Sequence, residues 1–400
     1  MITILCVDDE PDMEMLVMQQ FRKQIRSKEY AFIFASHGQE ALEKLAEHSD
    51  IKIVLSDINM PEMDGLTFLS KLKENNITEL KTIMVSAYSD MDNIRTAMNR
   101  GAFDFITKPI NFDDMDITIK KTLSEIEVYT NFQHDRDKLI AIQKDLAIAY
   151  EIQQSMLPKK ENPFPNRKEF SLHGLLQPAK SVGGDLYDYM LLSDNRLFFL
   201  IGDVSDKGVP AALFMAITRT LFKTHFDNYP NADLTEQIIH INNILARDNP
   251  SFMFVTVFAC ILDIDTGLVE YVDCGHEQPL IMRKATQEVE VLKKKDGGLP
   301  ICLTEDFPYF SSTFQLNPGD SIVLYTDGLE DAQDVDNVRF TIEPSKQLLK
   351  YALINEEPAK VNTELLKNVN SYIGDANQFD DITLLTLKYH GKQQFDIRTK

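Results

Sequence analysis

The stretch from residue 123 to residue 158 constrains the architecture of this chain most strongly, because its composition favours a single long helix. It contains no glycine, and its only proline is the last residue, Pro158. Residues of high helix propensity, such as Leu, Ala, Glu, Gln and Lys, dominate it. Strand-like segments lie on both sides of it. A long helix between two such regions predicts two folded domains joined by a helical linker, residues 123–157.

The second half of this helix carries an apolar seam with the heptad spacing of a coiled coil. The first half follows that spacing poorly, and residues 134–137 (HDRD) interrupt it. An exposed apolar seam needs a partner, so either it packs on the chain's own domains or two copies of the chain pair as a parallel homodimer. The seam residues are Leu139, Ile142, Leu146, Ala149 and Met156, with Gln153 as the polar exception.

Composition and charge narrow the function classes. The 400 residues carry a formal net charge of −21, which argues against a nucleic-acid partner and fits a protein that holds cations. The four cysteines show no metal-ligand spacing, so we expect them to be reduced in a cytoplasmic protein. The first apolar segment runs straight into Asp8, which predicts no signal peptide. No apolar run is long enough to predict a membrane span or a membrane partner.

The region before the helix alternates strand-like and amphipathic segments. This pattern predicts a five-stranded parallel sheet covered on both faces, with a site at the carboxyl ends of the strands. Chemically useful side chains follow four of the five strands at that edge: Asp8, Asp9, Asp57, Ser86 and Lys108. The expected strands are residues 2–7, 30–35, 51–55, 81–85 and 103–106, and helices are expected at 13–24, 39–47 and 91–99.

These side chains suit a phosphoryl group beside a metal ion. Three neighbouring carboxylates repel one another unless a cation lies between them, and Mg²⁺ prefers oxygen ligands. Lys108 and the hydroxyl of Ser86 could each bind a phosphoryl oxygen. A single Asp-Asp pair or Lys-Pro pair is usually a turn or a cap, but five such residues at successive strand ends predict a site.

Residues 1–122 resemble the receiver domain of bacterial two-component response regulators, which has a flavodoxin-like fold. The resemblance rests on VDDE at 7–10, DINMPEMDG at 57–65, VSAY at 85–88 and KP at 108–109. It implies that Asp57 is the phosphoacceptor of a sensor histidine kinase. It also implies that Phe105 is the switch aromatic, although a core Phe on an edge strand would fit the same position. The implied Mg²⁺ ligands are Asp8, Asp9, Asp57 and the backbone carbonyl of Asn59.

The region after the helix has a different character. Residues 158–169 read as an irregular linker, and strand runs then follow one another with turns between them. This pattern predicts an α+β domain of antiparallel sheets with helices outside, residues 170–390, followed by a tail at 391–400. Strands are expected at 197–204, 255–263, 268–273, 280–283, 288–292, 310–316, 321–325 and 382–388, and helices at 210–226, 234–247, 344–353 and 358–373.

Acidic residues mark the chemistry of this second region. Four aspartates that lie far apart in the sequence are each at a strand end: Asp185, Asp203, Asp327 and Asp380. A single one is most often a turn residue, but together they are typical of an oxygen-rich site for two divalent ions. No cluster of His or Cys accompanies them, which argues against zinc.

The same region resembles the PP2C-like (PPM) serine/threonine phosphatases of the bacterial stress and sporulation type, whose fold is an αββα sandwich. The motifs are EIQQSMLP at 151–158, GGDLYD at 183–188, GDVSDKGVPAAL at 202–213, YTDGL at 325–329 and DDIT at 380–383. The resemblance implies that Asp203 bridges two Mn²⁺ or Mg²⁺ ions and that the Val204 carbonyl binds one. Asp327 and Asp380 would complete the first metal site, and Asp185 the second. The motif alone leaves open whether Asp380 or Asp381 is the ligand.

Two positions depart from the family pattern. Asp206 stands where the family often has Gly, and residues 273–276 read DCGH where it often has NAGH. Neither change removes an implied ligand, so we expect an active enzyme. His276 could lie near the metals or could be a structural residue.

The combined resemblances imply a phosphorylation-controlled, metal-dependent phosphatase. Its substrate would be a small phosphoprotein of the anti-anti-sigma type, and phosphorylation of Asp57 would act through the linker helix. The main alternative is a non-enzymatic scaffold that binds a partner under receiver control. A nucleotide cyclase or phosphodiesterase output would need a GGDEF-like or EAL-like motif, and we find neither.

Overall fold

The computed structural model describes residues 1–74, 80–87, 91–158, 163–247, 249, 251–293 and 298–392, without the side chains of 352 and 353. Part of the expected 158–169 linker, Tyr88 of the VSAY motif and most of the expected 391–400 tail lie outside these ranges. The chain divides into two compact units, Met1–Ala141 and Ile142–Lys400. Each unit is described by itself.

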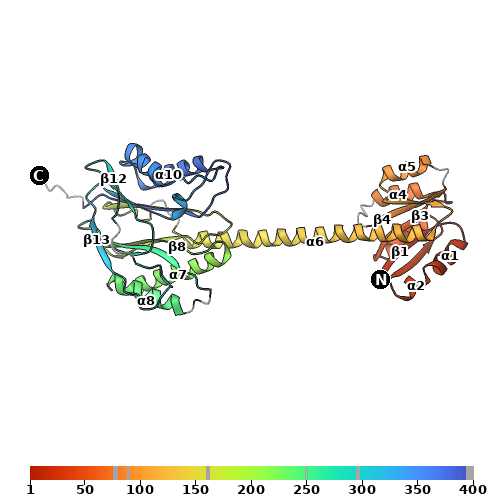
Figure 1. Ribbon diagram of the computed structural model, residues 1–400, viewed down its shortest axis with the longest axis horizontal. Helices are drawn as coiled ribbons and strands as arrows, with labels where there is room; N and C mark the ends of the chain where they lie inside the picture. Colours follow the sequence, from red (N-terminus) through yellow and green to blue (C-terminus); the bar gives the residue numbers. More distant parts are fainter. Residues whose placement is uncertain are drawn as a thin grey trace. The chain divides into compact units, whose positions relative to one another are not determined.

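The first unit is the expected flavodoxin-like domain, a five-stranded parallel sheet in the order β2-β1-β3-β4-β5 (Figure 1). On one face, Ile4, Leu55, Ile83 and Ile106 of four strands pack with Met115 from the helix that follows β5. Its elements are β1 (Ile2–Val7), α1 (Asp12–Gln20), α2 (Arg22–Arg26), β2 (Tyr30–Ala35), α3 (Gly38–Glu47), β3 (Ile51–Asp57), α4 (Gly65–Glu74), β4 (Lys81–Ala87), α5 (Met91–Arg100) and β5 (Asp104–Lys108).

Three strands extend beyond their expected ends. Asp57 is the last residue of β3 and Lys108 the last of β5, whereas we expected both to follow their strands. Ser86 likewise lies within β4. The ladder continues because each of these residues still pairs with the neighbouring strand, Asp57 with Val85 and Ser86 with Thr107. These three polar side chains therefore project from the strands themselves and not from the loops that follow them.

The long helix is α6 (Phe112–Met156), and it begins at residue 112 rather than 123. Asn111 starts it, since its side-chain oxygen accepts the backbone N–H groups of Asp113 and Asp114. Its first turns are part of the receiver core through Met115 and Ile119, so the last receiver helix and the linker helix are one element. In the described part of the chain, no helix combines the length and apolarity that crossing a membrane requires.

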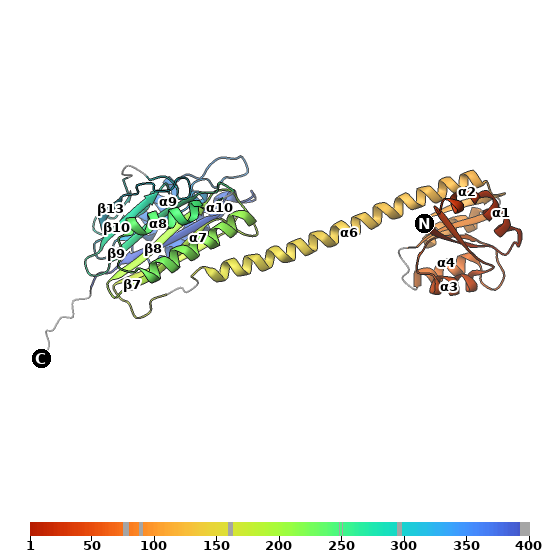
Figure 2. The same cartoon turned by 90° about the horizontal axis from the view of Figure 1, so that it is seen from below.

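The second unit has the expected αββα architecture (Figures 1 and 2). Its two antiparallel sheets have the strand orders β13-β10-β9-β8-β7 and β12-β11-β14-β15-β6. Its strands are β6 (Phe170–Gln177), β7 (Leu186–Ser193), β8 (Arg196–Val204), β9 (Val255–Asp263), β10 (Leu268–Cys274), β11 (Leu280–Arg283), β12 (Glu288–Val291), β13 (Ser311–Gln315), β14 (Ser321–Tyr325) and β15 (Ile382–Tyr389).

Three apolar layers hold this unit together. Phe199 and Leu385 belong to the layer between the two sheets. Phe222 belongs to the layer under α7 and α8, and Leu365 to the layer under α10. The helical elements are α7 (Val209–Asn228), α8 (Leu234–Arg247), a 3₁₀ turn (Asp327–Leu329), α9 (Glu343–Leu348), a π-helical turn (Leu349–Leu353) and α10 (Pro358–Ile373).

Strands β6 and β7 were absent from the expected set. Gly174 weakens the strand pattern of β6, and the buried Asp188 interrupts the apolar run of β7. The structure explains the glycine: a Cβ atom at residue 174 would lie 2.1 Å from Cε2 of Tyr187. The two sheets approach closely at this point, which requires a residue without a side chain.

Candidate functional site

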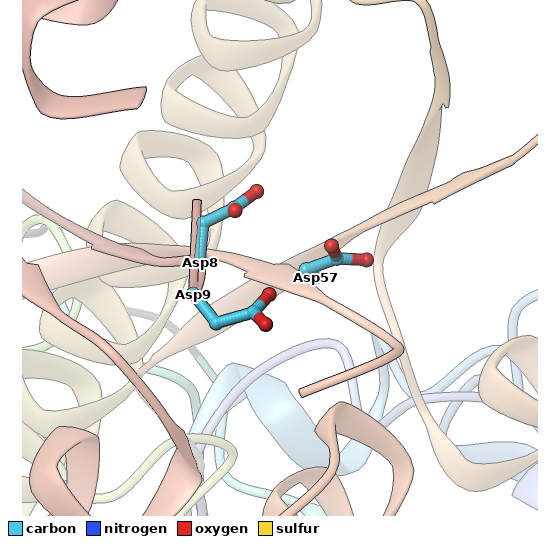
Figure 3. A group of neighbouring side chains, drawn as sticks. All are labelled: Asp8, Asp9 and Asp57. Atoms are coloured by element: carbon cyan, nitrogen blue, oxygen red, sulfur yellow. The ribbon is translucent and has the colours of Figure 1, made fainter. Parts of the chain in front are cut away.

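The first candidate site lies at the carboxyl ends of β1 and β3 in the first unit. Asp8, Asp9 and Asp57 each offer a carboxylate oxygen, and these oxygens all lie within 4.8 Å of one another (Figure 3). Asp57 is buried, Asp8 is half-buried and Asp9 is exposed. Burial is also the main cause that raises the pKa of Asp8 above its usual range. This all-oxygen set fits a small divalent cation such as Mg²⁺.

Lys108 joins this group from β5. Its Nζ lies 2.6 Å from Oδ2 of Asp57, 2.8 Å from Oε1 of Glu10 and 3.1 Å from Oδ2 of Asp8. Burial alone would lower the pKa of Lys108, but hydrogen bonds with Asp57 and Glu10 raise the pKa overall. The ammonium group is therefore charged and touches the proposed phosphoacceptor. Sequence reasoning missed Glu10, although it is the last residue of the VDDE motif.

The other three expected residues of this unit lie nearby in different environments. The hydroxyl of Ser86 is buried and has no hydrogen-bond partner among the described residues. Buried polar groups normally have such a partner, so this hydroxyl is suited to bind a ligand. Phe105 is 37% exposed on the edge strand β5, so the alternative reading as a core Phe is wrong. The backbone N–H of Asn59 donates to Oδ1 of Asp57, at a distance of 3.4 Å.

The second candidate site comprises four aspartates of the second unit whose charges act on one another. Among the described residues, only the receiver group brings three acidic side chains within 4.8 Å of one another. Asp203 is the penultimate residue of β8, and Asp327 follows β14 closely. Asp185 directly precedes β7, and Asp380 lies just before β15. The topology places β7 beside β8 in one sheet and β14 beside β15 in the other, so residues far apart in sequence meet at one end of the sandwich.

Electrostatics show that these carboxylates crowd one another. Burial and then the charge of Asp327 raise the pKa of Asp203 to about 8. Burial and then the charge of Asp380 raise the pKa of Asp327 to about 6. Burial, with Asp203 next in importance, raises the pKa of Asp185 well above its usual range. Divalent cations would relieve this repulsion, and an all-carboxylate donor set fits Mg²⁺ or Mn²⁺.

Two threonine hydroxyls fix the orientation of Asp185. Oδ2 of this carboxylate accepts hydrogen bonds from Thr326 (2.8 Å) and Thr383 (2.6 Å). The backbone N–H of Thr383 donates in turn to the hydroxyl of Thr326. Asp185 is 1% exposed, and both threonine hydrogen bonds use the same oxygen, Oδ2.

Asp381 has a different role from its neighbour Asp380. Its two carboxylate oxygens accept the backbone N–H groups of Ala179 and Gly184, each at 2.7 Å. A Cβ atom at residue 183 would lie 2.3 Å from Oδ2 of Asp381, which explains the glycine there. Asp381 thus ties the segment before Asp185 to the last strand. The oxygens of Asp380 have different partners: one accepts the backbone N–H of Asp381 (2.9 Å), and the other pairs with the side chain of Lys207 (2.7 Å).

The end of α6 holds the same glycine segment from the other side. The side-chain amide of Gln153 donates to the carbonyl of Gly183 (2.7 Å), and its oxygen accepts the N–H of Gly183 (3.1 Å). Gln153 is 4% exposed, although most of α6 around it is exposed. The polar exception in the heptad seam is therefore a contact to the segment that carries Asp185.

The two departures from the family pattern have structural explanations. Asp206 has φ of +68°, a left-handed conformation that Gly adopts easily and that Asp tolerates better than most residues. His276 is 3% exposed, and its ring nitrogens contact the Thr256 hydroxyl (2.8 Å) and the Tyr325 carbonyl (3.1 Å). Burial lowers the pKa of His276 to about 4. Both ring nitrogens have protein partners, which supports the structural reading of this histidine.

Comparison with known families agrees with this division of the chain. Residues 4–120 match the family described as response regulator receiver domain. Residues 193–390 match the family described as stage II sporulation protein E. Chemotaxis protein CheY of Bacillus subtilis is 36% identical over 121 residues, which are 30% of this chain and 97% of CheY.

Two further relatives match longer stretches of the chain. Protein IcfG of Synechocystis sp. is 28% identical over 266 residues, 59% of this chain but only 40% of IcfG. Phosphoserine phosphatase RsbU of Bacillus subtilis is 26% identical over 282 residues, 69% of this chain and 79% of RsbU. The solved SiaA-PP2C domain of Pseudomonas aeruginosa shares the fold, with a TM-score of 0.55 and 20% identity over 63% of this chain and 98% of that one.

Proposed function

We propose that this chain is a phosphoprotein phosphatase that is controlled through Asp57. The chain belongs to the response regulator receiver family and carries a PP2C-like domain of the stage II sporulation protein E family. The observation that carries the phosphatase assignment is the carboxylate cluster of Asp185, Asp203, Asp327 and Asp380. Its members lie at strands of two sheets, and burial followed by a neighbouring carboxylate raises the pKa of Asp185, Asp203 and Asp327. Burying neighbouring carboxylates lowers the stability of the fold, and a protein that only binds a partner would gain nothing from it.

The roles of the residues follow from their positions. Asp203 would bridge two divalent ions, Asp327 and Asp380 would hold the first with the Val204 carbonyl, and Asp185 would hold the second. When bound, the ions supply an activated water and offset charge on the phosphoryl oxygens. The chain supplies the orientation: Thr326 and Thr383 fix Asp185, and Asp381 holds the glycine segment before it.

In the receiver, Asp57 would accept a phosphoryl group from a sensor histidine kinase, with Mg²⁺ on Asp8, Asp9, Asp57 and the Asn59 carbonyl. Lys108 already contacts Asp57, so its ammonium can pass to a phosphoryl oxygen with little movement. The buried hydroxyl of Ser86 has no other partner among the described residues and can donate to a second oxygen.

The substrate we propose is phosphoserine or phosphothreonine on a small protein of the anti-anti-sigma type. RsbU, by its name a phosphoserine phosphatase, supports this substrate class. The test is release of inorganic phosphate from a phosphoserine peptide and from a phosphorylated anti-anti-sigma protein, with Mn²⁺ and with EDTA. We expect phosphate release with Mn²⁺ and none with EDTA. Binding of the phosphoprotein without any release would favour the scaffold instead.

Control would reach the metal site through α6, and Gln153 is the contact that supports this route. Replacing Gln153 by Leu removes two hydrogen bonds and leaves the buried N–H and C=O of Gly183 unpaired, which costs about 1–3 kcal/mol each. We expect phosphate release to fall about tenfold, the loss that results if about 1.4 kcal/mol of this cost appears in the activation free energy. The assay is kcat/KM on the phosphopeptide, with circular dichroism to confirm folding.

Gln143→Leu is the matched control for this prediction. It makes the same substitution on the same helix, at an exposed position. We expect wild-type activity from it. If Gln153→Leu folds and also keeps wild-type activity, α6 does not control the metal site through this contact.

We also propose that two copies pair along α6. Leu139 is 60% exposed and Ile142 is 55% exposed, although both belong to the apolar seam. A parallel helix pair would cover them. Sedimentation equilibrium of the full chain measures the assembly state, and a monomer at micromolar concentration would contradict this pairing.

A further inference from the structure

Lys207, which sequence analysis did not select, makes three contacts with the segment that carries Asp380. Its Nζ lies 2.7 Å from Oδ2 of Asp380 and donates to the backbone carbonyl of Phe379 at 2.8 Å. The same ammonium lies 4.4 Å from the centre of the Phe379 ring. A carboxylate, a carbonyl and an aromatic face together hold one cation, so this lysine is anchored although its side chain is 35% exposed.

The backbone places this lysine beside the metal-ligand cluster. Lys207 follows Asp206 and precedes Gly208, and both of these neighbours have positive φ, +68° and +86°. The turn between β8 and α7 therefore bends sharply only a few residues after Asp203. Among the ion pairs of the described residues, Lys207–Asp380 alone involves a proposed metal ligand of the second unit. The charge of Lys207 also acts on Asp327, where it opposes the rise in pKa.

We propose that Lys207 is a positioning residue that acts as a tethered counter-cation for Asp380 and weakens divalent metal binding at the first metal site. Without metal, its ammonium neutralises one of the four crowded carboxylates. When a divalent ion arrives, the ammonium must release Oδ2 of Asp380 or remain beside a second positive charge. In either case the positive charge of Lys207 opposes the metal ion. This inference rests on the proposed function, because it takes Asp380 as a metal ligand.

The contacts of Lys207 would link metal binding to the position of the segment between β8 and α7. Metal binding at Asp380 would be coupled to release of the segment between β8 and α7, which Lys207 ties to residues 379–380. The chain could then fold with its carboxylates together before any metal is bound. Metal affinity, rather than the presence of the ligands, would decide whether the enzyme is competent.

The test is calorimetric titration of the full chain with MnCl₂, in an Asp57→Asn background that removes one carboxylate from the receiver site. We expect Lys207→Met to bind Mn²⁺ about tenfold more tightly, the change expected from removing one charge near a partly exposed site. Its metal-free melting temperature should fall, because the carboxylates lose their counter-cation. Its melting temperature should rise more on Mn²⁺ addition than that of the parent protein.

Two matched variants separate charge from simple loss of packing. Lys207→Arg keeps the charge and should bind Mn²⁺ like the parent. Lys346→Met removes a lysine whose ion pair with Glu343 is similarly short, at 2.6 Å, but belongs to α9. It should leave Mn²⁺ affinity unchanged. These measurements need no turnover, so they read the metal site directly.

Unchanged or weaker Mn²⁺ binding by Lys207→Met would overturn the inference, and weaker binding would show that the lysine supports the metal instead. Failure of the proposed function looks different. In that case the parent protein itself would show no Mn²⁺ binding in the second unit, and adding Asp203→Asn would change nothing in the titration.

Discussion

Asp203→Asn is expected to abolish metal-dependent phosphate release, with a loss of about a thousandfold or more in kcat/KM. Asp203 lies at the centre of the cluster, where the charges of Asp327, Asp380 and Asp381 all raise its pKa. It is the one carboxylate proposed to contact both ions. An amide at this position keeps the shape of the side chain but removes the negative charge that would hold the two ions.

The same variant should be more stable than the wild type in the absence of metal. The pKa of Asp203 is raised to about 8 in the folded chain. At pH values above the ordinary pKa of an aspartate, the unfolded chain ionises this group more readily than the folded chain does, so the group destabilises the fold there. Asparagine removes that ionised form. We therefore expect a higher melting temperature without metal and little further rise on Mn²⁺ addition, both measured by thermal denaturation.

Asp206→Asn is the matched control for this prediction. It makes the same chemical change three residues downstream, on an exposed side chain, and Asn tolerates the left-handed backbone of residue 206. Its activity should remain at the wild-type level. Wild-type turnover by Asp203→Asn would show that the metal assignment of this cluster is incorrect.

Asp57→Asn is expected to remove covalent phosphorylation of the chain. Asp57 is the carboxylate that contacts Lys108 at the edge of the receiver sheet, and an amide nitrogen cannot accept the phosphoryl group in its place. Incubation with acetyl phosphate and Mg²⁺, followed by intact-mass measurement, should show the added phosphoryl mass in the wild type alone. Asp64→Asn, at an exposed position a few residues downstream, should still be phosphorylated. Labelling of Asp57→Asn would place the phosphoacceptor elsewhere.

The sequence predicted most of the receiver fold because strand patterns and candidate site residues coincide there. Apolar runs end in Asp8, Asp57 and Lys108, so periodicity and chemistry point to the same sheet edge. The errors lie in where elements end. Nothing in the composition around residue 112 distinguishes a receiver helix from a linker helix, and the structure joins them into α6.

The second unit was harder to predict for a different reason. Strand β6 contains Gly174, whose need becomes visible only when Tyr187 of the facing sheet is placed against it. Such contacts between sheets leave no periodic signal in the sequence. The four aspartates were recognisable because each lies at or beside a strand end within a specific motif.

Sequence analysis did not identify the residues that contact the proposed site residues without being proposed ligands themselves. Gln153 was only the polar exception in a heptad seam, and Lys207 was not selected from the motif that contains it. Glu10 shares Lys108 with Asp57, which no pattern in the sequence reveals. Long-range partners define the roles of all three, so only the assembled structure shows them.

The most direct test of the central claim is the phosphatase activity of the full chain with and without beryllofluoride, a mimic of the phosphoryl group on aspartate. We expect beryllofluoride to stimulate phosphate release by the wild type, because the modified receiver would act through α6 and Gln153 on the segment before Asp185. Asp57→Asn should release phosphate at one rate in both conditions. A wild type that is active but unaffected by beryllofluoride would contradict control of the phosphatase by the receiver.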